Sequence, residues 1–409
     1  MSENTCRFCR APLERTFADL GVSPLANRYL EPSQLSEMEP FYPLHARVCE
    51  RCWLVQVDSF ESPETIFGDY AYFSSYSTSW LDHAQRYVEA IVERLGLTPE
   101  HNVVELASND GYLLRNFVER GIPVRGVEPA ANVAEVAEAA GVPTVVEFFG
   151  VETARGLAQE RRADLLIANN VLAHVPDLND FVAGMKVLLA PGGVITVEFP
   201  HLKHLVDDNL WDTIYHEHFS YFSWVTAERV FAAHGLKLWD VEELPTHGGS
   251  LRIYGAHDDD PREPTERALE LAERERAAGY EGTALYDAYA ERVVRSKWEL
   301  LDFLIEQRRA GKRVVAYGAP AKGNTRLNYC GIRTDFIDFT ADLSPHKQGR
   351  HLPGSHIPIR APEAIDEARP DLVLILPWNL RDEITEQLAH VREWGGRFVV
   401  PAPAVEVIP

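Results

Sequence analysis

Short apolar segments alternate with amphipathic segments along residues 101–255 of this 409-residue chain. The apolar segments include VVEL at 103–106, LLIAN at 165–169 and VITVEF at 194–199. Strands separated by helices favour parallel βαβ units in a doubly wound sheet. The alternation restarts at 311 with KRVVAYGA and continues through DLVLILP and RFVVP, which predicts a second Rossmann-like sheet. The chain is therefore expected to be an α/β protein.

The length exceeds what one hydrophobic core usually supports, so several domains are expected. We predict a small module at 1–68, a first α/β domain at 69–255, and a helical connector with a C-terminal Rossmann-like domain at 256–409. Residues 256–310 are rich in Glu, Arg and Ala and are interpreted as exposed helices that form a solvated connector.

Four cysteines stand in two CxxC pairs within the N-terminal module, at Cys6, Cys9, Cys49 and Cys52. Each pair can place two thiolates on one ion, and four sulfurs complete a tetrahedral zinc site. A redox pair or free thiols are the alternative. A closed four-sulfur site leaves no position for a substrate, so the predicted zinc has a structural role.

The formal net charge of −22 predicts a surface that repels phosphate backbones and anionic membranes. We therefore expect neither nucleic acid nor a membrane as a partner. The start MSENTCRFCR lacks the apolar core of a secretory signal, and no apolar run reaches about 18 residues, which favours a cytoplasmic protein. A monomer or a small homo-oligomer is expected.

A turn rich in small residues follows the first strand, in VVELASNDGYLL. Such a turn lets backbone approach a ligand, and an acidic residue at the next strand end can bind ribose hydroxyls. Phe148 and Phe149 end the expected third strand, TVVEFF at 144–149, and could flank an adenine, while amide side chains follow the fourth strand. A helix, a tight Pro-Gly-Gly turn at 191–193 and a fifth strand are expected next. This order of elements favours the S-adenosylmethionine site of a class I methyltransferase over a dinucleotide-dependent dehydrogenase. The predicted cofactor residues are Glu105, Ala107, Asn109, Gly111, Glu128, Phe148, Phe149 and Asn169, with core packing as the alternative for both phenylalanines.

The segment TIYHEHFSYFS follows the fifth strand and is dense in ionisable side chains. If it is extended, Tyr215 and Glu217 share one face, while His216 and His218 share the other. The arrangement favours general-base catalysis by a histidine beside a carboxylate. A second metal on the His-x-His pair and purely structural histidines are the alternatives.

Nearly the whole chain resembles the sugar C-methyltransferases that act on nucleotide-linked 4-keto-deoxysugars. The resemblance rests on the paired CxxC start, the SNDG loop, the YxEH segment, the HGG strand, YGAPAKGNTRLNYCGI at 317–332 and DLSPHKQGRHLPGSHIPI at 342–359. It implies methylation next to the ketone, preferably at carbon 3, with carbon 5 as the alternative. Ala107 and Ser108 depart from the Gly and Cys that relatives often carry, as does His216 from the Asp of some relatives.

The resemblance also implies roles for individual residues. His218 matches the family's base, with Tyr215, Glu217, His174 and Tyr70 as further catalytic residues. Asn170 matches a position near the sugar. Apart from the resemblance, His247 before two glycines could line the same cleft, with a purely structural role as the alternative. Lys322, Arg326 and Lys347 could neutralise the diphosphate of the sugar nucleotide, with a dinucleotide turn in AYGAPAKG as the other interpretation. Two other classes stay open: an NAD-dependent sugar oxidoreductase and a zinc-dependent RNA methyltransferase, the latter disfavoured by the acidity.

Overall fold

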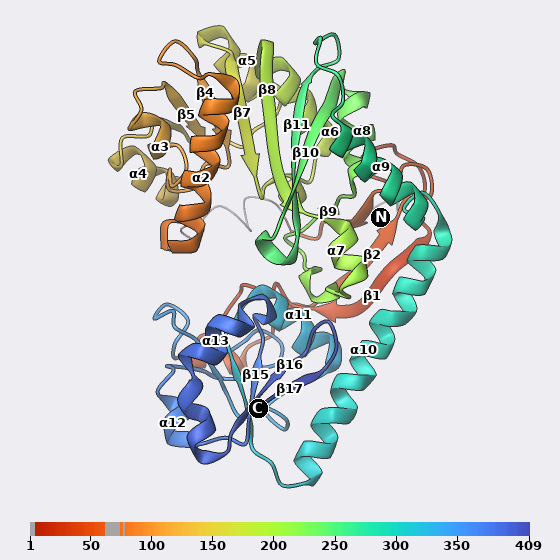
Figure 1. Ribbon diagram of the computed structural model, residues 1–409. Helices are drawn as coiled ribbons and strands as arrows, with labels where there is room; N and C mark the ends of the chain where they lie inside the picture. The colour runs from red at the N-terminus through yellow and green to blue at the C-terminus, as the bar shows by residue number, and fades with distance from the viewer. Residues whose placement is uncertain (1–4, 62–73, 77) are drawn as a thin grey trace.

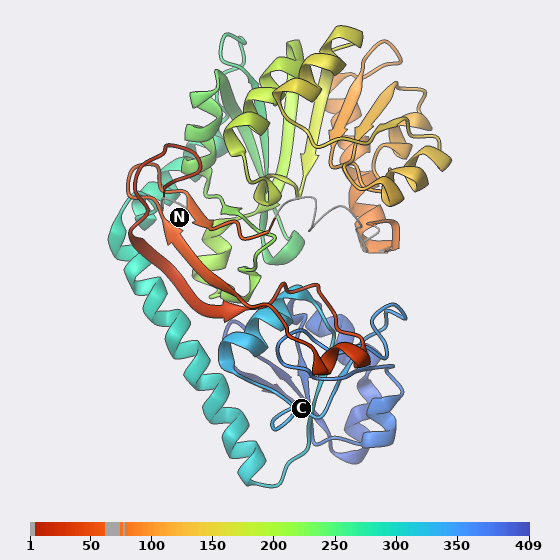
Figure 2. The same cartoon turned by 180° about the vertical axis from the view of Figure 1, so that it is seen from behind.

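The computed structural model describes residues 5–61, 74–76 and 78–409, which form three sheets. Figure 1 shows a large α/β unit above a smaller one, with a long helix that runs from the lower edge of the large unit down the side of the smaller one. The N-terminal strands lie between this helix and the two units (Figure 2). In the described part of the chain, no helix has the length and apolar composition that a bilayer crossing requires.

The N-terminal sheet has the order β1-β2-β3-β9 and is antiparallel throughout. Its first three strands are β1 (Arg15–Ser23), β2 (Tyr42–Val48) and β3 (Val55–Val57), and the short helix η1 (Pro32–Ser36) lies between β1 and β2. The fourth strand, β9 (Ser220–Tyr221), comes from the segment that follows the predicted catalytic residues. A distant part of the chain thus completes the sheet of the N-terminal module.

The central sheet has the order β10-β11-β8-β7-β4-β5-β6. The five strands β8, β7, β4, β5 and β6 are parallel, whereas β11 pairs antiparallel with both β8 and β10. This confirms the predicted doubly wound sheet. Its strands are β4 (Val103–Leu106), β5 (Val124–Val127), β6 (Thr144–Val145), β7 (Ala163–Asn169), β8 (Leu189–Pro200), β10 (Leu236–Leu244) and β11 (Ser250–His257).

Helices cover both faces of the central sheet (Figure 1). Along β7, Leu165 and Ile167 pack into one hydrophobic cluster, and Leu166 and Ala168 into another, as the alternation of side chains along a strand requires. The helices are α2 (Thr78–Leu95), α3 (Arg115–Val118), α4 (Ala131–Ala139), α5 (Val151–Glu160), α6 (Leu178–Leu188), α7 (Leu202–Asp207) and α8 (Trp224–Ala233), with short turns η2 (Ser74–Tyr76), η3 (Leu172–His174), η4 (Trp211–Thr213) and η5 (Thr246–Gly248).

Two local expectations need correction. The predicted third strand, TVVEFF, is a strand only over Thr144–Val145, because Val146 and Phe148 are exposed and form no further ladder. The predicted tight turn at 191–193 lies inside β8, where the pairing with β7 shifts from Ala163 opposite Leu189 to Leu165 opposite Val194. The residues between form a bulge instead of a separate turn.

The connector is also less solvated than the composition suggests. Its helices α9 (Glu266–Ala278) and α10 (Thr283–Arg309) bury Leu271, Tyr286 and Leu300 completely. The fully buried Glu275 accepts hydrogen bonds from the backbone N–H groups of Trp224 and Val225, at the start of α8. The connector therefore packs into the common core rather than only joining two domains.

The C-terminal sheet has the order β14-β13-β12-β15-β16-β17, parallel except for β17, and confirms the second Rossmann-like domain. Its strands are β12 (Val314–Tyr317), β13 (Thr340–Ala341), β14 (Ile359–Arg360), β15 (Leu372–Ile375), β16 (Arg397–Val400) and β17 (Glu406–Ile408). Its helices are α11 (Ala321–Cys330), α12 (Ala364–Ala368) and α13 (Arg381–Gln387), with η6 (Trp378–Leu380) and η7 (Ala389–Trp394).

A buried ion pair joins the central and C-terminal domains. Asp212 of η4 and Arg326 of α11 are 0% and 1% exposed at their side chains and lie 2.9 Å apart. Trp378 donates from its indole N–H to the same carboxylate at 3.0 Å, and the Arg326 guanidinium stacks on Trp211. The carboxylate of the central domain therefore has both of these partners in the C-terminal domain.

Replacing Arg326 with Met is expected to lower the free energy of unfolding by about 3–5 kcal/mol, because Asp212 would remain a buried charge without its counter-ion. Urea unfolding measures the loss. Arg308→Met is the control, since Arg308 contacts Asp338 at 3.7 Å on the surface, where an ion pair contributes about 0–1 kcal/mol. Equal small losses in both variants would contradict the assignment.

Candidate active site and zinc centre

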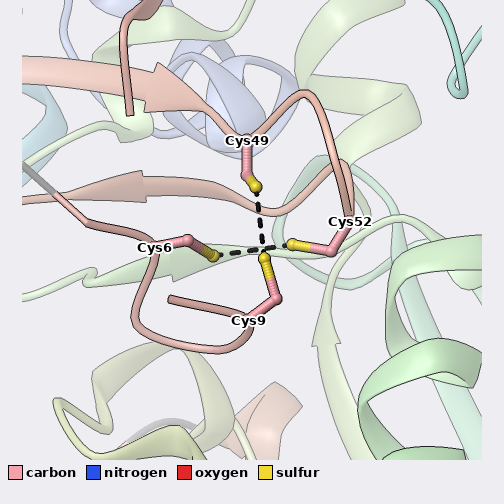
Figure 3. A group of neighbouring side chains, drawn as sticks. All are labelled: Cys6, Cys9, Cys49 and Cys52. Atoms are coloured by element: carbon pink, nitrogen blue, oxygen red, sulfur yellow. Dashed lines mark hydrogen bonds between the residues drawn. The ribbon is translucent and has the colours of Figure 1, made fainter. Parts of the chain in front are cut away.

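The four N-terminal cysteines converge on one point (Figure 3). Their sulfur atoms all lie within 4.8 Å of one another, and the Cys6–Cys52 and Cys9–Cys49 separations are 3.5 Å. Four sulfurs at about 2.3 Å from a zinc ion stand about 3.8 Å apart in a tetrahedron. The spacing and the all-thiol donor set therefore fit a structural zinc ion.

The two CxxC pairs share one backbone geometry. The carbonyl of Cys6 accepts from the N–H of Arg10, and that of Cys49 accepts from the N–H of Trp53. Arg10 and Trp53 both adopt the left-handed conformation, with φ of 60° and 67°. Each turn thus bends the chain so that both of its thiols face the same side. Among the residues the structure describes, no other cluster has the composition of a metal site.

The SNDG loop lies at the carboxyl end of β4, as predicted. Ala107, Asn109 and Gly111 have φ of 55°, 50° and 75°, so the loop is a left-handed turn. A Cβ on Gly111 would lie 3.0 Å from Val142, which explains the glycine. Glycine would adopt this conformation without strain, and Ala107 there costs about 1 kcal/mol.

Buried acidic groups line this loop. Glu105 lies within β4 rather than on the turn, is 1% exposed, and its Oε2 has no hydrogen-bond partner among the described residues. Burial, with Glu128 and Asp110 nearby, raises the pKa of Glu105 well above its usual value. Glu128, at the end of β5, accepts from the N–H groups of Asn109 and Ala130 at 3.0 and 2.9 Å. These carboxylates suit a ligand that carries hydroxyl groups and positive charge.

Amide groups complete this edge of the sheet. Asn169 ends β7 with an Oδ1 that has no partner among the described residues, and the side-chain O and N of Asn170 are likewise buried without one. Asn170 adopts φ of 54°, and its N–H donates to the carbonyl of Glu198 at 2.7 Å. Because buried polar groups are normally paired, these atoms fit a bound polar ligand.

The two phenylalanines after β6 differ in their surroundings. Phe149 packs edge to face on Phe181 of α6, with ring centroids 5.4 Å apart, and is therefore part of the hydrophobic core. Phe148 is 42% exposed. Core packing, the alternative considered for both residues, therefore describes Phe149, whereas Phe148 is the one with a ring surface open to a ligand.

A turn, and not an extended strand, presents the acid–base segment. The N–H of His218 donates to the carbonyl of Tyr215 at 2.9 Å, which brings their rings to a centroid distance of 4.0 Å. The predicted faces are therefore wrong: Tyr215 and His218 lie together, whereas His216 contacts the carbonyl of Pro43 in the N-terminal module at 3.1 Å. This separation also removes the geometry needed for a His-x-His metal pair.

Hydrogen bonds assign the tautomer of His218. Its Nδ1 lies 2.9 Å from the carbonyl oxygen of Thr213, which only accepts, so Nδ1 carries the proton. Nε2 is then the basic nitrogen and accepts from the Tyr215 hydroxyl at 2.8 Å. The ring of His174, from η3 after β7, lies edge to face at 4.7 Å. The arrangement can take up a proton at Nε2.

Glu217 points toward a different partner. Its side chain is 7% exposed and both oxygens accept from the amide of Asn27, at 2.8 and 3.0 Å. Burial raises the pKa of Glu217 to about 7. Tyr70 and the side chain of His247 lie outside the described part of the structure.

Comparison with known proteins assigns the chain to a family. A methyltransferase domain model matches residues 80–241, a zinc binding domain model matches 6–67, and a C-methyltransferase C-terminal domain model matches 245–403. The C-methyltransferase NovU of Streptomyces niveus is 37% identical over 404 residues, which cover 98% of this chain and 96% of that protein. The chain belongs to this C-methyltransferase family. It is a zinc-binding, S-adenosylmethionine-dependent C-methyltransferase.

More distant matches cover smaller parts of the chain. The ubiquinone biosynthesis O-methyltransferase of Rhodopseudomonas palustris is 26% identical over 117 residues, 28% of this chain and 46% of that protein. The magnesium protoporphyrin IX methyltransferase of Synechocystis with bound S-adenosylhomocysteine covers 44% of this chain and 84% of its own, at 14% identity and a TM-score of 0.36. The family assignment rests on the full-length relative.

The HGG motif of this C-methyltransferase lies where the central and C-terminal domains meet. Gly248 and Gly249 have φ of 89° and 119°. A Cβ on Gly248 would lie 2.9 Å from Trp378, and one on Gly249 would lie 2.2 Å from His204. Both positions therefore require glycine. A cavity of about 250 Å³ opens beside Gly248, Leu210, Trp378 and Asn379.

The three predicted diphosphate ligands have different surroundings. Arg326 is 1% exposed and paired with Asp212, so its role in binding phosphate is corrected to a structural one. Lys322 contacts Asn379, and its Nζ lies 4.1 Å from the Trp378 ring centroid, beside the cavity. Lys347 donates to the carbonyl of Ala319 at 3.0 Å and lies 3.6 Å from Asp342.

Two features of the site escaped the sequence analysis. Glu198 of β8 is fully buried beside Asn170 and accepts from Arg252 and Thr246, with His83 of α2 at 3.0 Å. Asn27 reaches Glu217 across 190 positions. The sequence does mark Glu198, because an acidic residue within the apolar run VITVEF needs a buried partner. No local sequence feature marks Asn27.

Proposed function

We propose that this C-methyltransferase methylates the carbon next to the ketone, preferably carbon 3, of a nucleotide-diphosphate 4-keto-6-deoxysugar. The observation that carries the proposal is His218, whose Nδ1 is hydrogen-bonded to a carbonyl, so that Nε2 is the basic nitrogen. A ketone acidifies the neighbouring C–H bond, because loss of the proton gives an enolate.

In this reaction His218 Nε2 accepts the proton from the sugar carbon. General-base catalysis of this kind contributes about 10²–10⁴-fold to the rate. The Tyr215 hydroxyl, which donates to the same nitrogen before substrate binds, becomes a donor for the enolate oxygen once the nitrogen is protonated. S-adenosylmethionine, when bound, supplies the sulfonium methyl that the enolate carbon takes, and S-adenosylhomocysteine is released.

Residues of the central domain are proposed to hold the cofactor. Glu128 would accept from the ribose hydroxyls, Glu105 and Asn169 offer unpaired oxygens, and the SNDG loop offers its backbone. Phe148 would cover the adenine. Lys322 and Lys347 are proposed to face the diphosphate, whereas Asn170 and His174 would contact the sugar. Holding both reactants in line makes the transfer effectively unimolecular.

The test is incubation with methyl-labelled S-adenosylmethionine and a panel of thymidine-diphosphate 4-keto sugars. We expect label in the sugar, on carbon 3 by NMR, and no absorbance change from a nicotinamide. Label on carbon 5 would support the alternative position. Label on a sugar oxygen, or none on any ketosugar, would contradict the proposal.

A further inference from the structure

The segment between β1 and η1 leaves the N-terminal sheet and crosses to the C-terminal domain (Figure 2). The Tyr29 hydroxyl donates to the carbonyl of Ala319 at 2.6 Å, and the amide of Asn324 donates to the carbonyl of Ala26. Leu30 and His351 exchange backbone hydrogen bonds of 2.9 and 2.8 Å. The segment is therefore anchored on both sides of Asn27.

Asn27 reaches from this anchored segment to the turn at 215–218, which is called the catalytic turn below. Its Nδ2 lies 2.8 and 3.0 Å from the two oxygens of Glu217, and its Oδ1 lies 3.4 Å from the Tyr29 hydroxyl. Since a carboxylate only accepts, the amide nitrogen must face Glu217. Within the described residues, no other side chain donates a hydrogen bond to Glu217.

Strand pairing holds the same turn from its other end. Val55 of β3 pairs with Tyr221 and Gln56 with Ser220, and the N–H of Val57 donates to the carbonyl of Phe219 at 3.1 Å. Strand β3 begins directly after the second cysteine pair. The N-terminal module therefore contacts the catalytic turn at Glu217 and pairs with the chain again just after His218.

We propose that Asn27 is a positioning residue, which orients the Glu217 carboxylate within the catalytic turn, so that the zinc module forms part of the active site. This inference rests on the proposed function, because it assigns a role to a neighbour of the proposed base.

The hydrogen bonds from Asn27 oppose the effect of burial. Burial raises the pKa of Glu217 to about 7, and Asn27 lowers it. Loss of the amide raises the pKa further, so Glu217 becomes protonated at neutral pH. Tyr29 of the same segment, and His216 and His218 of the turn, are its titratable neighbours. The acidic limb of the pH profile of kcat should then move to higher pH.

The experiment compares Asn27→Ala and Asn27→Asp with Glu39→Ala in the full-length, zinc-loaded enzyme. Glu39, which follows η1, tethers the N-terminal module to Gly354 and His356 but contacts no residue of the catalytic turn in the described structure. Both Asn27 variants should lower kcat at pH 7 by about tenfold to a hundredfold, as expected for a lost hydrogen bond to a charged group. Zinc content and S-adenosylmethionine affinity should stay at wild-type values.

The decisive readout is the position of the acidic limb. It should move upward in both Asn27 variants and stay in place in Glu39→Ala. An unmoved limb in Asn27→Ala, whether kcat falls or not, would overturn the positioning role. Wild-type activity on the ketosugar panel tests the proposed function separately, so the two failures are distinguishable.

Discussion

His218→Ala is expected to lower kcat about a thousandfold, the loss that follows when a positioned general base is removed. The affinity for S-adenosylmethionine should stay unchanged, because the predicted cofactor residues lie in β4 and β7 and at the ends of β4, β5 and β6, and not in the catalytic turn. Exchange of the acidic sugar proton with deuterated water, measured without methyl transfer, should fall with kcat. That readout follows the proton step alone.

Tyr215→Phe is the matched control for His218→Ala. It keeps the ring beside His218 and removes only the hydroxyl that lies 2.8 Å from Nε2. We expect a smaller loss, about tenfold to a hundredfold, for one hydrogen bond to a developing charge. If His218→Ala exchanged the proton at the wild-type rate, another residue would be the base.

Removal of zinc is expected to abolish turnover while the central sheet stays folded. Structural zinc contributes an apparent binding free energy of about 10–16 kcal/mol in small zinc modules, far more than the remaining core of such a module. Because β3 pairs with β9, loss of the module should also free the amides of Ser220 and Tyr221. Hydrogen exchange after chelation, with activity in parallel, measures both effects.

Cys49→Ser should reproduce the effect of the chelator, whereas Cys330→Ser should retain full zinc. Cys330 is buried in α11, far in sequence from the cluster, and burial raises the pKa of its thiol to about 12. Full activity in zinc-free protein would contradict the link between the module and the catalytic turn.

Local sequence patterns determined the strands, the metal site and the loop after the first strand of the central sheet. The strands β4, β7 and β8 follow from apolar runs that a parallel sheet buries on both faces. The cysteine pairs predicted one metal site because CxxC spacing is itself a short-range geometric constraint. The loop after β4 and Glu128 were expected at strand ends, which a doubly wound sheet brings to one edge. Here the chemistry depends on residues close in sequence or on a regular topology.

Tertiary structure decided which side chains meet. The turn at Tyr215 to His218 replaced the expected extended segment, because Glu217 and His216 find partners in the N-terminal module. Arg326 was assigned to a diphosphate because its sequence shows a cation and not the buried Asp212 that neutralises it. Periodicity specifies which face of an element is buried but not what packs against it. The identity of a partner more than a hundred residues away depends on how the N-terminal module, the central domain and the C-terminal domain pack together.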